Sequence, residues 1–365
     1  MDTIQNYKCP CCGAPLVFSG EKQMLHCASC SNDFEPETIK LVYEADEAAN
    51  SESHYEWNEY TPRQFTMEDT TLREYECPSC GAQITGDNST GATICPYCGN
   101  TTIMKDKFEG VYMPDYIIPF RVEKKSAMEL LQSSAKKKFL IPSAFKSESK
   151  LKKIMGVYVP FWMFDCDADA DITYTGERVT TWHDSRYDYV KTDFYRLFRS
   201  GKAQFENIPV DASLAAENEY MDALEPFDYG DAVKFNSSYL SGYLADKYDV
   251  SVDDSIERAN KRIRSSMESI LMRDTHKYAA VRTESASIRF HDGKVRYALL
   301  PVWMLNVAYG GSLYKFAING QTGKIVGQYP VDKGKLFLLR IGLFALITVI
   351  GAGICWLAKK WGLVS

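Results

Sequence analysis

The sequence predicts an α+β protein, in which two small cysteine-rich modules precede a mainly antiparallel mixed domain and one C-terminal transmembrane helix. Three observations support this fold class. Pairs of the form C-x-x-C occur twice in each of two N-terminal blocks, strand and helix patterns follow one another over residues 105–332, and an apolar run lies near the C-terminus. With 45% hydrophobic and 25% charged residues in 365 positions, the composition is that of a globular protein with room for several units.

The apolar run predicts a transmembrane helix over residues 336–358. Residues 341–358 carry no charge, and the whole helix would be about 34 Å long, enough to cross roughly 30 Å of hydrocarbon. Basic and tryptophan residues flank the run, as interfacial anchors do. These are Lys333, Lys335, Trp356, Lys359, Lys360 and Trp361. The alternative is a core helix buried in a soluble domain.

The transmembrane helix has a consequence for the location of the rest of the chain. The N-terminus has no basic segment followed by an apolar core, so a secretory signal is not expected. We therefore expect a single-pass protein of the cell membrane, with its N-terminal body in the cytoplasm and a short tail, residues 359–365, across the bilayer. A reducing cytoplasm favours metal binding over disulfides for paired cysteines.

The two cysteine blocks are copies of one pattern. Fourteen residues separate the C-x-x-C pairs in each block, and a shift of 68 positions superposes all four cysteines. Such a period indicates an internal repeat of a small module. We predict module 1 over residues 1–34 and module 2 over residues 72–104.

This spacing is typical of zinc ribbons, because a C-x-x-C turn lets two thiolates reach one tetrahedral Zn²⁺ at about 2.3 Å. Gly13 and Gly81 follow the second cysteine of a pair, where a positive φ is needed. Four sulfur ligands leave no open coordination position, so we expect two structural zinc ions. The predicted ligands are Cys9, Cys12, Cys27, Cys30, Cys77, Cys80, Cys95 and Cys98. Cys11 and His26 are expected to be bystanders.

An acidic segment separates the two modules. Residues 35–76 hold twelve acidic and three basic side chains, a net charge of −9, and the whole chain carries −6. A phosphate backbone would be repelled, which argues against nucleic acid as a partner. We predict a solvated linker over residues 35–71, although its aromatics, such as Tyr55 and Trp57, could instead form a docking segment.

Residues 105–332 are predicted to form one mixed α+β domain. Residues 156–165 and 299–306 both read as strands, and Pro160 and Trp162 of the first match Pro301 and Trp303 of the second. We interpret this echo as core packing, with two related sheet halves as an alternative. Further patterns predict a strand at 116–122, helices near 128–139 and 253–273, and a hairpin with an Asn-Gly turn at 316–326.

Four aspartates alternate with small residues from Asp165 to Asp171. On a strand this pattern places the acids on the solvent face and Cys166, Ala168 and Ala170 inward. Calcium binding is the alternative, but the glycine and distal glutamate of an EF-hand loop are missing.

Motifs of known catalytic chemistry are absent from the sequence. There is no G-x-S-x-G, no Walker-type phosphate loop and no H-E-x-x-H. His183-Asp184 could be half of a catalytic arrangement, but we interpret it as a surface turn. We therefore expect no enzyme and no small-molecule substrate, with a hydrolase hidden in the mixed domain as a third hypothesis.

The two modules, the segments Y-V-P-F-W and A-I-N-G-Q-T-G-K, and the terminal apolar helix together resemble a bacterial family. Its members are labelled TFIIB-type zinc-ribbon-containing proteins and are sometimes misnamed primosomal helicases. The resemblance implies a membrane protein of unknown chemistry. Similar proteins are encoded beside phage-shock protein A and an SPFH-domain protein, which suggests a part in membrane-stress assemblies. We expect a membrane-anchored adaptor that recruits a cytosolic protein; a membrane-tethered nucleic-acid-binding protein is the alternative.

Overall fold

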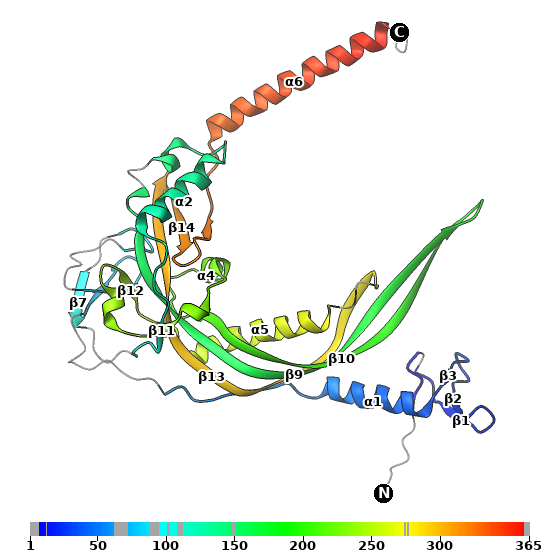
Figure 1. Cartoon of the computed structure of the whole chain (residues 1–365). Helices are drawn as coiled ribbons and strands as arrows, with labels where there is room; N and C mark the ends of the chain where they lie inside the picture. The colour runs from blue at the N-terminus through cyan, green and yellow to red at the C-terminus, as the bar shows by residue number, and fades with distance from the viewer. Residues whose placement is uncertain are drawn as a thin grey trace. The chain divides into compact units, whose positions relative to one another are not determined.

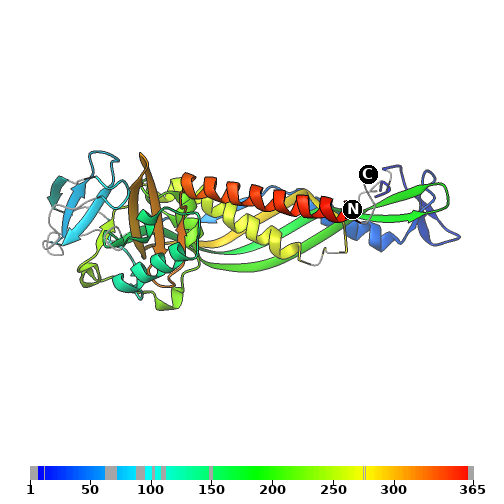
Figure 2. The same cartoon turned by 90° about the horizontal axis from the view of Figure 1, so that it is seen from above.

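The computed structural model confirms an α+β protein with mixed sheets (Figures 1 and 2). It describes residues 7–11, 13–61, 72–87, 95–100, 103–107, 112–147, 151–273, 275 and 277–360. The chain divides into two compact units, each made from three segments. Unit 1 comprises residues 1–60, 164–208 and 256–295, and unit 2 comprises residues 61–163, 209–255 and 296–365.

Unit 1 begins with a small antiparallel sheet of three strands. These are β1 (Val17–Ser19), β2 (Met24–His26) and β3 (Asp33–Phe34), followed by α1 (Pro36–Asn50) and β4 (His54–Trp57). The rest of the unit contains most of α5 (Val252–Leu271) and parts of the long strands β9 (Met155–His183), β10 (Asp188–Asp211) and β13 (Ala280–Tyr309). Its core forms where Ile263 and Met267 of α5 pack with Ile172 of β9 and Ile288 of β13.

Part of the acidic segment between the modules is folded and is not a solvated linker. Ile39 and Ala49 of α1 are buried, and β4 pairs in parallel with β13. The ring of Tyr55 lies 4.5 Å from that of Phe290, and the indole N–H of Trp57 donates to Asn260 at 2.9 Å. The prediction of a solvated linker is wrong here because a few apolar side chains of the segment are buried, although its overall composition is acidic. Residues 62–71 of the predicted linker lie outside the described residues.

Unit 2 contains a sheet with the strand order β11-β8-β13-β9-β12-β6-β5-β7, and β14 and β15 extend it from β13. Its shorter strands are β5 (Leu72–Glu76), β6 (Gln83–Asp87), β7 (Ile103–Lys107), β8 (Tyr116–Ile117), β11 (Val233–Lys234), β12 (Leu244–Asp246), β14 (Ser312–Asn319) and β15 (Ile325–Gly327). Its helices are α2 (Lys124–Lys136), α4 (Asn218–Leu224) and α6 (Lys333–Lys360), and its 3-10 turns are η2 (Ser143–Lys146), η3 (Tyr229–Asp231) and η4 (Ser237–Leu240). The strands of module 2 therefore form one edge of this sheet.

The two strands with the echoed sequence are neighbours, β9 and β13, in this sheet. Trp162 and Trp303 are buried, and each indole N–H donates to a backbone carbonyl, that of Val250 at 2.9 Å and that of Val122 at 2.8 Å. The core-packing interpretation is confirmed, because buried indoles need an acceptor as well as apolar neighbours.

Most other predicted elements are present with shifted ends. α2 begins before the predicted helix near 128–139 and ends at Lys136, so Phe139 lies outside it and is exposed. α5 corresponds to the predicted helix at 253–273, and β14 and β15 form the predicted hairpin. The predicted strand at 116–122 is shorter, because β8 ends before Pro119, which has no N–H to donate to a sheet.

The C-terminal helix α6 is long and apolar enough to cross a membrane, as predicted for residues 336–358. None of its span from Lys333 to Gly353 is buried, and its 28 residues extend about 42 Å. Asp332 caps its start, since its carboxylate accepts from the backbone N–H groups of Gly334 and Lys335 at 3.0 and 3.1 Å.

Candidate metal centres

Each of the four C-x-x-C pairs adopts the same backbone turn. The N–H of the first cysteine donates to the carbonyl five residues later, and the N–H four residues later donates back to the carbonyl of that cysteine, at 2.6–2.9 Å throughout. The residue four positions on has a positive φ in every turn: Gly13 (71°), Ser31 (58°), Gly81 (75°) and Gly99 (78°). The expected positive φ of Gly13 and Gly81 is confirmed, and Ser31 adopts this conformation with a side chain.

In module 2 this turn brings together all four predicted cysteines, which we call cluster 2. The sulfurs of Cys77 and Cys98 lie 3.5 Å apart, and those of Cys80 and Cys95 lie 3.6 Å apart. All four lie within 4.8 Å of one another, close enough to hold one metal ion. The cluster joins residues up to 21 positions apart, which a single C-x-x-C pair could not do.

In module 1 the structure brings together three of the four predicted cysteines, which we call cluster 1. The sulfurs of Cys9 and Cys30 lie 3.5 Å apart, with that of Cys27 within 4.8 Å of both. Cys12 lies outside the described residues, so its part in the cluster stays a prediction. The side chain of His26 binds Asp33 at 2.6 Å instead of joining the cluster.

The thiols of cluster 2 differ in how easily they ionise. Burial opposes ionisation of Cys77, but backbone N–H groups of Ser79 and Cys80 outweigh it and lower the pKa of the thiol to about 7. Burial raises the pKa of Cys80 to about 11 and raises the pKa of Cys95 as well. A cation would favour all four thiolates, since a coordinating thiol is deprotonated by its metal. The donor set therefore suits a metal ion that prefers sulfur.

Cluster 2 is attached to the sheet of unit 2 by a buried polar network that the sequence did not reveal. Tyr97, between Cys95 and Cys98, donates its hydroxyl to the carboxylate of Asp246 on β12, which also accepts from the hydroxyl of Ser213 at 2.5 Å. Burial raises the pKa of Asp246 to about 7 and that of Tyr97 well above its ordinary value. No local pattern could identify this contact, because 149 residues separate its partners.

Further contacts extend this attachment. β12 pairs antiparallel with β6 at Ala245–Thr85 and Asp246–Ile84. The side-chain amide of Asn306 donates to the carbonyl of Pro96, inside the C-x-x-C turn, at 2.7 Å. Backbone and side-chain bonds thus both connect module 2 to the body of its unit.

Among the described residues, cluster 1 is connected to α1 through Tyr43. The hydroxyl of Tyr43 on α1 accepts from the backbone N–H of Lys8 at 2.6 Å and donates to the carbonyl of the same residue at 3.1 Å. The ring of Tyr7 packs edge-on against Tyr43 with centres 5.1 Å apart. These contacts are exposed, and the three strands of module 1 form a sheet of their own.

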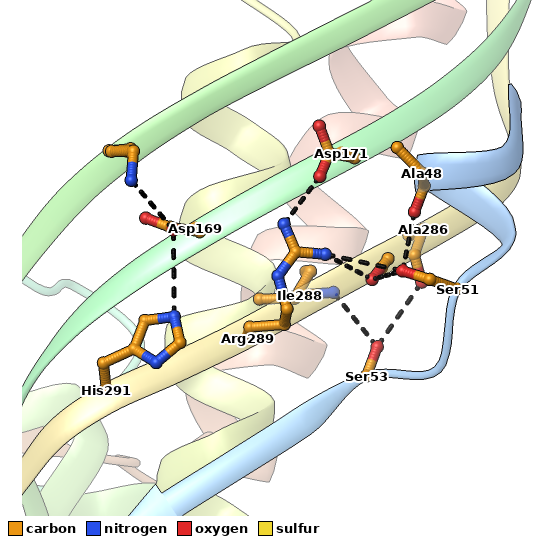
Figure 3. Close-up of polar contacts among 11 residues, drawn as sticks. Ala48, Ser51, Ser53, Asp169, Asp171, Ala286, Ile288, Arg289 and His291 are labelled. Carbon is orange, nitrogen blue, oxygen red and sulfur yellow. Dashed lines mark hydrogen bonds and ion pairs between the residues drawn. The ribbon is translucent and has the colours of Figure 1, made fainter. Parts of the chain in front are cut away.

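Two of the alternating aspartates of β9, Asp169 and Asp171, lie within ion-pair distance of basic side chains (Figure 3). Asp171 accepts from Arg289 at 2.7 Å, and Asp169 lies 3.0 Å from Lys202 and 3.7 Å from His291. Burial opposes ionisation of Asp171, but the bonds from Arg289 and Ser200 outweigh it and lower its pKa. Cys166, Ala168 and Ala170 are buried as predicted. Among the described residues, the groups of side chains placed to share a metal ion are the two cysteine clusters.

The hairpin of β9 and β10 extends from unit 1 as an exposed arm, residues 178–192. Every residue of the arm is exposed, and its turn is closed by a bond from the N–H of Asp184 to the carbonyl of Tyr187 at 3.0 Å. The predicted surface turn at His183-Asp184 is confirmed. Trp182 stacks on Tyr189 on one face of the arm, with ring centres 5.3 Å apart. Since side chains alternate along strands, the other face carries Val179, Thr181, Val190, Thr192 and, just beyond the arm, Phe194.

That second face continues into a groove of about 660 Å³ within unit 1. Phe194 and Phe198 of β10 line the groove together with Phe34 and Val42, and its lining also includes the charged side chains of Arg196 and Glu284. Val190 and Phe194 are 68% and 67% exposed. The same alternation places the charged Asp188 on this face near the turn. Exposed apolar side chains that lead into a groove are typical of a surface that binds another protein.

Fold and clusters together define a class: an α+β protein with two cysteine clusters able to hold metal ions and one helix able to cross a membrane. Comparison with curated proteins finds 33% identity over 333 residues to the uncharacterized protein YdjG of Bacillus subtilis (strain 168), covering 91% of this chain and 92% of YdjG. The chain therefore belongs to the same family as YdjG. No family model matches the chain, and no solved structure matches it.

Proposed function

We propose that the protein is a membrane-anchored zinc-ribbon adaptor, without catalytic activity, that holds a cytosolic protein at the bilayer. The observation that carries this proposal is the exposed arm with its apolar face and groove, on a chain that also has a candidate membrane helix. Fifteen consecutive exposed residues in a two-stranded ribbon contribute little to the stability of unit 1. A partner protein that covers the face would bury the side chains that water now surrounds.

Zinc is the metal that we propose for both clusters. A tetrahedral site with zinc–sulfur bonds of about 2.3 Å separates its sulfurs by about 3.8 Å. The separations of 3.5 and 3.6 Å in cluster 2 support such a site without rearrangement of the backbone. All-sulfur coordination leaves no position for a substrate, so the ions would be structural.

The orientation that we propose places the N-terminal body in the cytoplasm. Reduced thiols are needed to hold zinc, and a reducing compartment keeps them so. The partner would then be a cytosolic or membrane-associated protein; the family resemblance suggests an SPFH-domain or phage-shock-type protein.

Affinity purification of the full chain from detergent-solubilised membranes tests the adaptor function. We expect a specific partner to copurify with the wild type, and its recovery to fall at least tenfold for Val190→Ser combined with Phe194→Ser. Leu214→Ser combined with Leu313→Ser is the matched control, because these leucines are also exposed but lie in unit 2. Recovery of the partner by both double variants alike would refute docking at the arm.

The same purification tests the remaining parts of the proposal. About two zinc ions per chain are expected by metal analysis. Full-length chain in the soluble fraction would contradict membrane anchoring. Nucleic acid retained in a salt-dependent manner, with no protein partner, would favour the tethered nucleic-acid-binding alternative.

A further inference from the structure

The residues that follow α2 lie against the first turn of α6, within unit 2 (Figure 1). The backbone N–H of Asp332 donates to the carbonyl of Leu140 at 2.7 Å, and the ammonium group of Lys335 donates to the carbonyl of Ile141 at 2.6 Å. The ammonium group of Lys138 lies 4.6 Å from the centre of the Tyr329 ring. These contacts hold the end of α2 beside the point where α6 begins.

Positive charge is concentrated in the parts of the sequence that contain these contacts. Residues 123–153 hold nine lysines and three glutamates, a net charge of +6, in a chain whose total is −6. Residues 331–340 add Lys333, Lys335 and Arg340 against Asp332, whose carboxylate is engaged in capping α6. We call Lys136, Lys137, Lys138, Lys333 and Lys335 the basic collar; all are exposed except Lys335, which is half-buried.

An exposed aromatic residue lies next to these lysines in the sequence. Phe139 follows the three consecutive lysines directly and is 71% exposed. A solvated helix face explains lysines near a helix C-terminus, but it does not explain a phenylalanine in water among them. Basic residues with an aromatic side chain beside them are typical of a surface that lies on the lipid headgroups.

We propose that the basic collar binds the anionic headgroups of the leaflet that α6 enters, and that Phe139 inserts between those lipids. This inference rests on the proposed membrane anchoring of α6. Lys333 and Lys335 belong to the first turn of α6, and Lys136, Lys137 and Lys138 lie at the end of α2, just before the residues that contact this turn. The ammonium groups of the collar would therefore lie near the headgroups, where attraction extends over a Debye length of about 8 Å. Contact at two places, α6 and the collar, would restrict rotation of unit 2 about the helix and would make the protein prefer regions rich in acidic lipid.

Photo-crosslinking in nanodiscs tests this proposal on the full chain. p-Benzoylphenylalanine replaces Phe139, and the chain is reconstituted in phosphatidylcholine alone or with about 30% phosphatidylglycerol. The lipid adducts are then quantified by mass spectrometry. The same probe at Leu214, 78% exposed and also in unit 2, is the positional control. We expect adducts at position 139 to exceed those at position 214 at least fivefold in the acidic discs and to decrease without phosphatidylglycerol.

A matched pair of triple variants tests the lysines. Lys136→Gln, Lys137→Gln and Lys138→Gln together should reduce the adduct yield at least threefold in acidic discs and remove its dependence on phosphatidylglycerol. Lys40→Gln, Lys261→Gln and Lys294→Gln remove three exposed charges from unit 1 and should leave the yield unchanged.

The outcomes separate this inference from the membrane anchoring on which it rests. If the chain elutes with the nanodiscs but position 139 gives no more adducts than position 214, lipid binding by the collar is refuted and the membrane anchoring by α6 stands. An equal loss for both triple variants would show a general charge effect and would also refute it. Failure of the chain to elute with nanodiscs would overturn both.

Discussion

The two cysteine modules have the same sequence pattern and the same backbone turns, but they differ in what surrounds them. Module 1 has its own three-stranded sheet and exposed contacts through Tyr43. Module 2 contributes β5, β6 and β7 to the edge of a large sheet, with Tyr97 bonded to the buried Asp246. We therefore expect loss of a metal ion to affect only module 1 in the first case and the whole of unit 2 in the second.

The largest effect is expected from removing one buried ligand of each cluster. Cys95→Ser should lower the free energy of unfolding of unit 2 by about 4 kcal/mol, since loss of a metal is among the most damaging changes. Cys27→Ser, equally buried, should abolish protection of residues 7–34 and change the rest of unit 1 by no more than about 0.5 kcal/mol. Hydrogen exchange on the full chain, with metal analysis, measures both. Equal global destabilisation by the two variants would contradict the comparison.

A smaller effect is expected from the two tyrosine hydroxyls that connect the modules to their units. Tyr97→Phe leaves the buried carboxylate of Asp246 with one donor fewer, and should destabilise unit 2 by about 2 kcal/mol. Tyr43→Phe removes an exposed hydroxyl that water replaces, so its cost should be below about 0.5 kcal/mol. Chemical denaturation followed by hydrogen exchange measures the loss of stability in each variant. A larger loss for Tyr43→Phe than for Tyr97→Phe would contradict the difference that we infer between the two modules.

The smallest effect is a difference in pH dependence. The pKa of Asp246 is raised to about 7 by burial, so between its ordinary value and pH 7 the folded state binds more protons than the unfolded state. The stability of unit 2 should therefore fall as pH rises, by about 1 kcal/mol from roughly pH 5.5 to 6.5. The pKa of Asp33 in module 1 is lowered by hydrogen bonds from Lys22 and His26, so its contribution is present above its ordinary pKa and is lost at lower pH.

Asp246→Asn isolates this pH dependence, because it keeps an acceptor for Tyr97 and removes the titration. Denaturation curves at several pH values should show a flatter dependence for the variant than for the wild type. The metal sites are common to both proteins, so their own titration cancels in the difference. Identical slopes would exclude Asp246 as the cause.

The sequence predicted correctly those structural features that depend on residues close together in the chain. The C-x-x-C pairs, the glycines after them and the alternating aspartates are local patterns, and the structure agrees with each. The apolar run was equally clear, because a bilayer requires about 20 consecutive apolar residues. The joining of two pairs into one cluster could be predicted only because the module is repeated.

Contacts between distant segments could not be predicted from the sequence. Tyr97 and Asp246 meet only because β12, three residues long, pairs with β6. Likewise Trp57 and Asn260 are 203 residues apart. Nothing near Asp246 distinguishes it from the many solvated acids of this chain, since burial and a distant partner give it its properties. Strand pairing of this kind depends on the whole fold, which local periodicity does not encode.

Both units are built from segments that interleave along the chain, and β9, β10 and β13 contribute residues to each. No contiguous fragment of the gene encodes one unit without part of the other, so truncation at a boundary between their segments would leave unpaired strands on both products. Contacts at such sequence separation also slow folding, because long loops must close before distant strands can pair. During synthesis the first segments must wait for residues up to 295 to emerge, and in that interval a chaperone would find exposed strand edges to protect.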